Sequence, residues 1–155
     1  MTQEEKNEKL ENFNSWIQTI EERILDWKQT LNQETKNQFD YSVQSLDKIE
    51  SYLTSKYELE DLSNQENKIE IDACLSYVLE VFRRNLPTNE FLIELEDEKN
   101  VLFNRPAVNT KPKVGMDFSP YYFLPSIINL KRVGDFRKQF EIKMRKYSEE
   151  YSNEK

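Results

Sequence analysis

Neither glycine nor proline occurs in the first 32 residues, and apolar side chains recur there every three or four positions. Residues with this spacing lie in one stripe along an α-helix, and no local breaker interrupts the stripe. Trp16 and Leu25 flank the stripe and widen it, which favours packing into a globular domain over a short coiled coil. The sequence therefore predicts a long amphipathic first helix. Its stripe consists of Leu10, Phe13, Ile17, Ile20, Ile24, Trp27 and Leu31.

Two more helical patterns follow. Residues 32–38 are polar and predict a turn, after which apolar residues recur at helical spacing from Phe39 to Tyr57. The short connection favours antiparallel packing of this second helix on the first, as a helical hairpin. A third helix is expected over residues 66–85, with Cys74 on its apolar face and Glu80 on its polar face.

Pro87 ends this helix, and a period-two pattern over residues 91–96 then predicts a strand. Residues 97–100 form the expected turn, residues 101–103 the partner strand, and the Pro- and Gly-containing stretch 105–117 a loop. The aromatic block 121–124 lies between Pro120 and Pro125 and is interpreted as a short strand or an extended segment. Residues 126–130 remain open between a strand and a helical turn.

A last helix is expected to begin at residues 134–135, with Asp135 as its N-cap. Phe136, Phe140 and either Lys143 or Met144 continue its apolar stripe, and residues 148–155 are expected to fray.

The expected fold class is α+β, in one domain over residues 1–155. An N-terminal antiparallel helical hairpin occupies residues 1–65, and a third core helix, a small antiparallel sheet and a C-terminal helix occupy residues 66–147. An apolar share of only 37 % is compensated by two Trp, eight Tyr and nine Phe, which provide bulky groups to bury.

Charge is distributed unevenly along the chain. Residues 1–72 carry 8 basic and 17 acidic side chains, whereas residues 73–155 carry 14 basic and 12 acidic ones. The two halves can complement one another within the fold, or the acidic half can meet a basic partner. A total net charge of −7 makes nucleic-acid binding an unfavourable interpretation, because phosphate contacts depend on Lys and Arg.

Several chemistries are excluded or disfavoured by residue type. The chain has no His, which removes His-based triads, His general bases and His-ligated metals. Cys74 is the single cysteine and is expected to be inert on an apolar face. Gly115 and Gly134 stand alone, so no glycine-rich phosphate loop is present. We expect no enzyme activity, no metal and no cofactor.

The polar, acidic N-terminus does not resemble a signal peptide, and no apolar run approaches the about 20 residues that cross a bilayer. The expected location is cytoplasmic, without membrane contact.

Five residues are candidates for contact with a partner. Tyr121 and Tyr122 point to opposite sides of an extended segment, so one of them can be exposed, whereas both can also pack in the core. Glu80 lies in an apolar run, where a buried carboxyl could be an acid or base. The better interpretation is a solvated ion pair with Arg83 and Arg84, three and four residues further on.

The stretch of residues 72–85, an aromatic near Phe91, and residues 120–132 are similar to a layout in small uncharacterised bacterial α+β proteins of the immunity or antitoxin type. The resemblance covers roughly residues 70–147 and implies no site residues. The absence of catalytic constellations, the acid-rich helical hairpin and the Tyr-rich segment predict a non-enzymatic protein that binds another protein. Together with the resemblance, the acidic first half suits an immunity protein that neutralises a basic toxin. The alternative is a small-ligand-binding or regulatory domain with a pocket between the third helix and the sheet. A homodimer is expected if Trp16 and Leu25 are exposed together.

Overall fold

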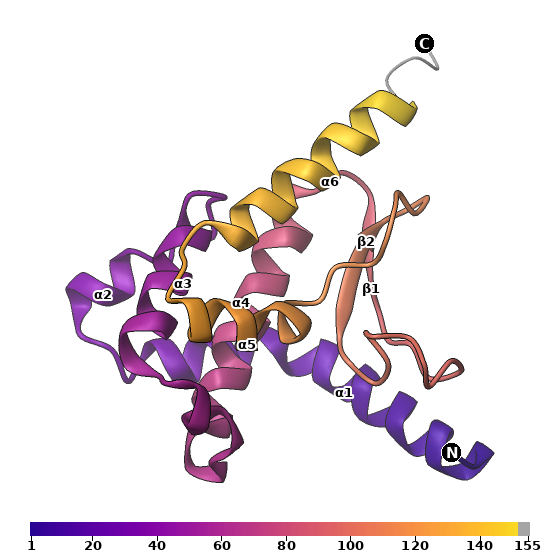
Figure 1. Cartoon of the computed structure of the whole chain (residues 1–155), viewed down its shortest axis with the longest axis horizontal. Coiled ribbons are helices and arrows are strands. Elements are labelled where there is room, and N and C mark those ends of the chain that lie inside the picture. Colours follow the sequence, from indigo (N-terminus) through magenta and orange to yellow (C-terminus); the bar gives the residue numbers. More distant parts are fainter. Residues whose placement is uncertain (152–155) are drawn as a thin grey trace.

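The computed structural model describes residues 1–151. Figure 1 shows α4 in the middle of the molecule, with α2 and α3 on one side, a two-stranded sheet on the other and α1 running below. The expected α+β fold, with N-terminal helices and a C-terminal helix, is confirmed. The helices are α1 (Gln3–Lys28), α2 (Gln33–Asn37), α3 (Ser45–Lys56), α4 (Lys68–Asn85), α5 (Pro120–Leu130) and α6 (Asp135–Tyr151). The other elements are the 3₁₀ turns η1 (Leu59–Ser63) and η2 (Gln65–Asn67) and the strands β1 (Asn89–Leu92) and β2 (Ala107–Thr110).

α4 is the core helix, and every residue from 73 to 82 is buried. α1, α3, α5 and β2 all pack against it. The predicted polar face of this helix is not solvated at Ser76 and Glu80, because α1 covers these residues. Trp16 of α1 donates its indole N–H to the Ser76 hydroxyl at 3.3 Å, and both Ser76 and Glu80 are fully buried. Buried polar groups of this kind are tolerated because they are hydrogen-bonded.

The second predicted helix is shorter than its apolar spacing indicates. α3 begins at Ser45, and Phe39 lies in the segment before it. That segment bends at Tyr41, whose φ of 64° is incompatible with a right-handed helix. The predicted turn over residues 32–38 instead contains α2, capped by the Asn32 side chain. α1 and α3 meet where the rings of Trp27 and Tyr52 are 5.7 Å apart, and both helices pack on α4.

The predicted hairpin has the wrong second strand. β1 pairs antiparallel with β2, which lies in the predicted loop, and Phe91 is opposite Val108. Residues 101–103 contribute one isolated bridge, between Glu94 and Phe103. All four residues of β2 are buried, so this segment has the stronger drive to pair next to α4.

The aromatic block is helical, so the interpretation of residues 121–124 as extended is wrong. Pro120 occupies the first turn of α5, where its missing N–H costs nothing. Leu124, Ile127 and Ile128 recur at helical spacing and are buried. Residues 126–130 continue the same helix, which ends at Lys131 in the left-handed region with φ 50°.

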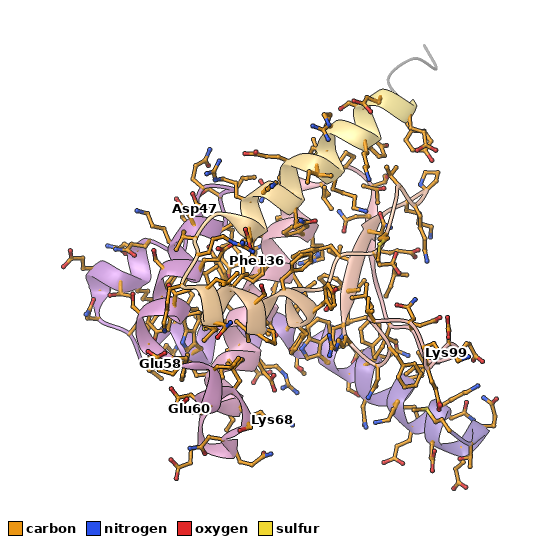
Figure 2. All side chains as sticks on the ribbon, viewed as in Figure 1. Asp47, Glu58, Glu60, Lys68, Lys99 and Phe136 are labelled. Atoms are coloured by element: carbon orange, nitrogen blue, oxygen red, sulfur yellow. The ribbon has the colours of Figure 1, made fainter. Side chains whose placement is uncertain are left out.

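The N-terminus of α6 is capped from another helix. The Glu50 side chain of α3 accepts hydrogen bonds from the backbone N–H groups of Gly134 (2.8 Å), Asp135 (3.2 Å) and Phe136. Asp135 therefore does not cap the helix as predicted, and its carboxylate pairs with Arg132 at 2.8 Å. Figure 2 shows Phe136 directed into the core beneath α6.

At the other end, residues 148–151 continue α6, so the predicted fraying is wrong for them. Residues 152–155 lie outside the described part.

Candidate functional site

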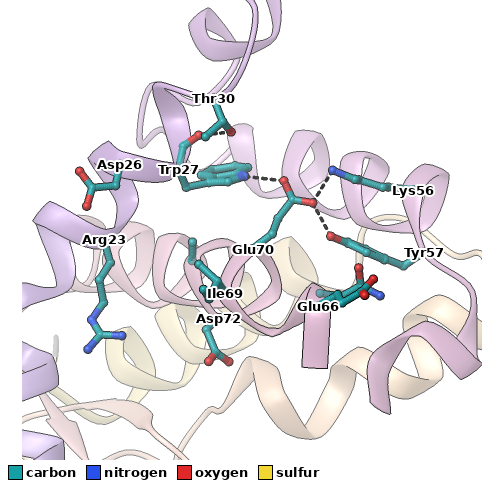
Figure 3. A pocket seen from close by; sticks show the side chains of 12 residues that line it. Arg23, Asp26, Trp27, Thr30, Lys56, Tyr57, Glu66, Ile69, Glu70 and Asp72 are labelled. Atoms are coloured by element: carbon teal, nitrogen blue, oxygen red, sulfur yellow. Dashed lines mark hydrogen bonds and ion pairs between the residues drawn. The ribbon is translucent and has the colours of Figure 1, made fainter. Parts of the chain in front are cut away.

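A cavity of about 580 Å³ opens between α1, the end of α3 and the start of α4. Figure 3 shows Arg23 and Asp26 of α1 on one side of it and Ile69 and Asp72 of α4 on another. Trp27 contributes an apolar wall, and its ring packs on Phe39 with centroids 5.1 Å apart. The α4 residues are adjacent on the first two turns of that helix and face α1, which places them on the cavity.

Glu70 anchors one wall of this cavity. Its carboxylate accepts hydrogen bonds from Trp27 Nε1 (3.0 Å), the Tyr52 hydroxyl (2.8 Å) and the Tyr57 hydroxyl, and it pairs with Lys56 at 2.6 Å. Burial alone would raise the pKa of Glu70, but these donors outweigh it and hold the pKa below its usual value. The carboxylate is therefore a charged, fully engaged support and not a proton acceptor.

Three further carboxylates border the cavity and form no ion pair in the described chain. They belong to Asp26, Glu66 and Asp72. Burial raises the pKa of Asp72, against smaller opposing effects of the cations Lys68 and Arg23 and of the Tyr121 hydroxyl, which lies 3.5 Å from its Oδ1. Arg23 also lines the cavity, but its Nε donates to a threonine of its own helix. The site has an excess of negative charge.

The rim of the cavity carries an exposed apolar side chain. Ile69 is 86 % exposed at the start of α4, which is the largest exposure among the large hydrophobic residues of the described chain. A single exposed apolar side chain is common on protein surfaces, so Ile69 adds apolar area at the rim but does not by itself mark a binding surface.

Glu80, Arg83 and Arg84 form the predicted ion pairs, but the geometry differs from the prediction. Glu80 is fully buried, and Nε of Arg83 and of Arg84 donate to it at 2.8 Å and 2.9 Å. The expectation that Glu80 is solvated and touches a partner is wrong, because α1 lies over that side of α4. Arg83 and Arg84 remain accessible, with side chains 43 % and 40 % exposed.

The two candidate tyrosines have different environments. Tyr122 is 45 % exposed, whereas Tyr121 is half-buried behind Asp72. Burial raises the pKa of the Tyr121 hydroxyl. The two side chains diverge because they are neighbours on a helix, not because the segment is extended.

The dimer patch expected from Trp16 and Leu25 does not form. Leu25 is 51 % exposed, but Trp16 is half-buried and stacks on Phe13 with ring centroids 5.7 Å apart.

The pocket expected between the third helix and the sheet is occupied by aromatic side chains. Phe82 of α4 stacks on Phe118, which bridges to β2, with centroids 4.2 Å apart. Cys74 is buried, and burial raises the pKa of its thiol, in agreement with the inert role expected for it.

Lys143 is a buried cation that sequence reasoning placed on the apolar stripe without a role. Its Nζ donates to the carbonyl oxygens of Val114 and Met116, which ties α6 to the loop after β2. Burial lowers its pKa to about 8; the neighbouring Asp117 opposes this shift and Lys146 adds to it.

No group of three or more His, Cys, Asp or Glu side chains that could hold a metal ion occurs within residues 1–151. Over the same residues, no helix combines the length and apolar character needed to cross a membrane.

Comparisons with family models, curated proteins and solved structures give no match. The resemblance to immunity-type proteins therefore stays a prediction, and function has to be inferred from the site. The cavity itself was missed because Asp26, Glu66 and Asp72 come from separate elements. The only sequence signal for it is the excess of acidic residues before residue 73.

Proposed function

We propose that this protein binds a basic protein and that a Lys or Arg side chain of the partner enters the cavity next to Trp27. The observation that carries the proposal is the set of three carboxylates, Asp26, Glu66 and Asp72, that line the cavity and form no ion pair within residues 1–151. Asp72 is half-buried, where a cation at hydrogen-bond distance stabilises a carboxylate, whereas Asp26 and Glu66 are exposed and add negative charge around it.

The apolar part of the cavity suits the stem of a long cationic side chain. Lys and Arg bury their methylene groups along apolar surface while the charged end reaches a polar partner. Trp27 can contact such a stem or cation, and Ile69 at the rim adds apolar contact area.

Long-range electrostatics supports the same partner class. Residues 1–72, which supply most of the cavity, carry 17 acidic and 8 basic side chains. Such a surface accelerates encounter with a basic protein and disfavours an acidic one. The resemblance to immunity-type proteins adds a specific form of this proposal, a bacterial cytoplasmic inhibitor of a basic toxin.

The test compares two sets of variants in affinity capture, followed by calorimetry with the captured partner. The triple variant Asp26→Asn, Glu66→Gln, Asp72→Asn removes the unpaired charge of the cavity. We expect it to lose a stoichiometric basic partner that the unmodified protein retains, with an affinity loss of about tenfold or more, since truncated contacts at an interface centre cost about 1 kcal/mol or more each.

The control set removes equal charge elsewhere, by Glu8→Gln, Glu11→Gln and Glu60→Gln, which are exposed and form no ion pair in the described chain. It should weaken binding only through the overall charge. Equal losses in both sets would refute the cavity as the binding site.

A small organic cation is the second candidate occupant, because a volume of about 580 Å³ falls within the range of small-molecule pockets. Titration with spermidine and with an arginine tripeptide separates the two. Tight spermidine binding together with no captured protein would favour a small-ligand-binding domain.

A further inference from the structure

Arg83 and Arg84 present two guanidinium groups at the end of α4 in fixed positions. The Arg84 guanidinium carbon lies 3.7 Å from the ring centroid of Tyr41, and that of Arg83 lies 5.9 Å from the ring of Phe91. Both Nε atoms, and also Nη2 of Arg83, donate to the buried carboxylate of Glu80. Each side chain is thus held by a buried acceptor and an aromatic ring, while about two-fifths of it stays exposed.

Tyr41 is itself held in an unusual backbone conformation. Its φ of 64° is in the left-handed region, which non-glycine residues adopt at a cost of about 1–2 kcal/mol. The Tyr77 hydroxyl accepts from the Tyr41 N–H at 2.9 Å, and Asn85 Nδ2 donates to the Tyr41 carbonyl at 2.9 Å. These two hydrogen bonds therefore hold the Tyr41 ring in the position in which it packs against Arg84.

An anionic group from α1 already lies on the arginine pair. Glu21 Oε1 is 3.3 Å from Nη2 of Arg83 and 3.4 Å from Nη2 of Arg84, and the Glu21 side chain is 64 % exposed. Charge-assisted hydrogen bonds are normally about 2.7–2.9 Å long. Glu21 is therefore a loosely bound, exchangeable occupant of a position that faces both guanidiniums.

We propose that Arg83 and Arg84 form a binding site for a phosphate group, which displaces Glu21. Because Glu80 already accepts from Nε of both arginines and from Nη2 of Arg83, the phosphate would meet the two Nη2 groups that face Glu21. Arginine N–H groups form strong charge-assisted hydrogen bonds with phosphate oxygens. A second carboxylate would gain little over Glu21, which carries the same single charge and is tethered nearby. A phosphate group carries about −1.5 to −2 charges near neutral pH and therefore attracts the two arginines more strongly than a carboxylate does.

The surrounding charge supports an anion at this position. Lys28 Nζ lies 4.9 Å from the Tyr41 ring centroid and donates to the Phe39 carbonyl at 2.7 Å. Burial and the nearby cations Lys36 and Arg84 lower the Lys28 pKa, against a smaller opposing effect of Asp40. The cations around Tyr41 thus repel one another, and a bound phosphate would relieve that repulsion.

The experiment follows the arginine side-chain N–H signals by NMR during titration with inorganic phosphate at constant ionic strength and pH 7.5. Glu21→Gln vacates the site, and Glu22→Gln is the matched control, because it removes the same charge from the adjacent exposed residue, which forms no ion pair in the described chain. Loss of a weak exposed pair should tighten binding by about two- to fivefold in Glu21→Gln. Glu22→Gln should bind as the unmodified protein does.

Further arms test the ligand and the arginine pair. Arg84→Lys keeps the charge but loses the guanidinium N–H groups, so its phosphate affinity should fall while its unfolding curve stays cooperative. Tighter binding of O-phosphoserine than of inorganic phosphate assigns the site to a phosphorylated protein, and the reverse order assigns it to free phosphate. The proposal is overturned if acetate binds as well as phosphate, if the two Glu→Gln variants gain equally, or if the arginine signals do not respond.

Discussion

The cap that Glu50 provides for α6 leads to the strongest stability prediction. Glu50 is fully buried and accepts three backbone N–H bonds from residues that are 84 to 86 positions away in the chain. Burial raises the pKa of Glu50 and outweighs the opposing effect of these three hydrogen bonds, so the charge itself does not stabilise the fold. The stability comes from satisfying the N–H groups, since a buried donor left without an acceptor costs about 1–3 kcal/mol. Glu50→Gln keeps one acceptor oxygen and the side-chain volume, so we expect a loss of about 1–3 kcal/mol. Glu50→Ala leaves all three donors without an acceptor and should cost about 3–5 kcal/mol.

Urea unfolding followed by circular dichroism measures both losses. Glu58→Gln is the control, because it removes the same charge from an exposed ion pair with Lys131, which should change stability by less than about 1 kcal/mol. In Glu50→Gln the amide protons of residues 134–136 should also exchange faster, since one of their two acceptor oxygens is replaced by an amide NH₂ group. If Glu50→Gln were no more destabilising than Glu58→Gln, the hydrogen bonds to Glu50 would not stabilise the fold and the reasoning would be refuted.

Three more outcomes follow from buried groups. Because the pKa of Glu70 is lowered in the folded state, the free energy of unfolding should fall as pH drops below about 4.5, and Glu70→Gln should remove that part of the decrease. Lys143 titrates near pH 8 in the folded chain and near 10.5 when unfolded, so stability should rise between these values relative to Lys143→Met. Phe82→Ala removes a fully buried ring and should cost about 3–5 kcal/mol in urea unfolding.

Each of these measurements has a matched comparison. Glu66 lines the same cavity, but its side chain is exposed. Glu66→Gln should therefore keep the decrease in the free energy of unfolding at acid pH that Glu70→Gln loses. Lys138→Met should leave the alkaline rise in place, because Lys138 is exposed on the same helix and is not among the groups that shift the pKa of Lys143. A Phe82→Ala variant as stable as the unmodified protein would contradict the packing described for α4 and Phe118.

Helices with a regular apolar stripe could be predicted from the sequence. α1 and α4 were expected near their observed positions because their 3.6-residue periodicity coincides with burial. The polar residues of α4 were misplaced for a physical reason. Periodicity marks Ser76 and Glu80 as polar, but it cannot reveal that Trp16, Arg83 and Arg84 would satisfy them inside the fold.

The errors elsewhere come from interactions between distant segments. Residues 39–43 keep helical spacing, yet the backbone at Tyr41 turns to meet Tyr77 and Asn85. The strand that pairs with β1 depends on which segment packs on α4. α5 forms in spite of Pro125 because its apolar side chains are buried together. The cavity and the Glu50 cap bring together residues from different elements, which a local pattern cannot indicate.

The placement of both proposed sites on α4 fixes their separation. Asp72 borders the acidic cavity and Arg84 belongs to the arginine pair, and they are twelve residues apart on one helix whose middle is buried throughout. At a rise of 1.5 Å per residue this corresponds to about 18 Å along the axis. A molecule that carries a cationic side chain and a phosphate group at that distance would engage both sites at once and gain from the higher effective concentration. A molecule in which the two groups are closer together could reach only one of them.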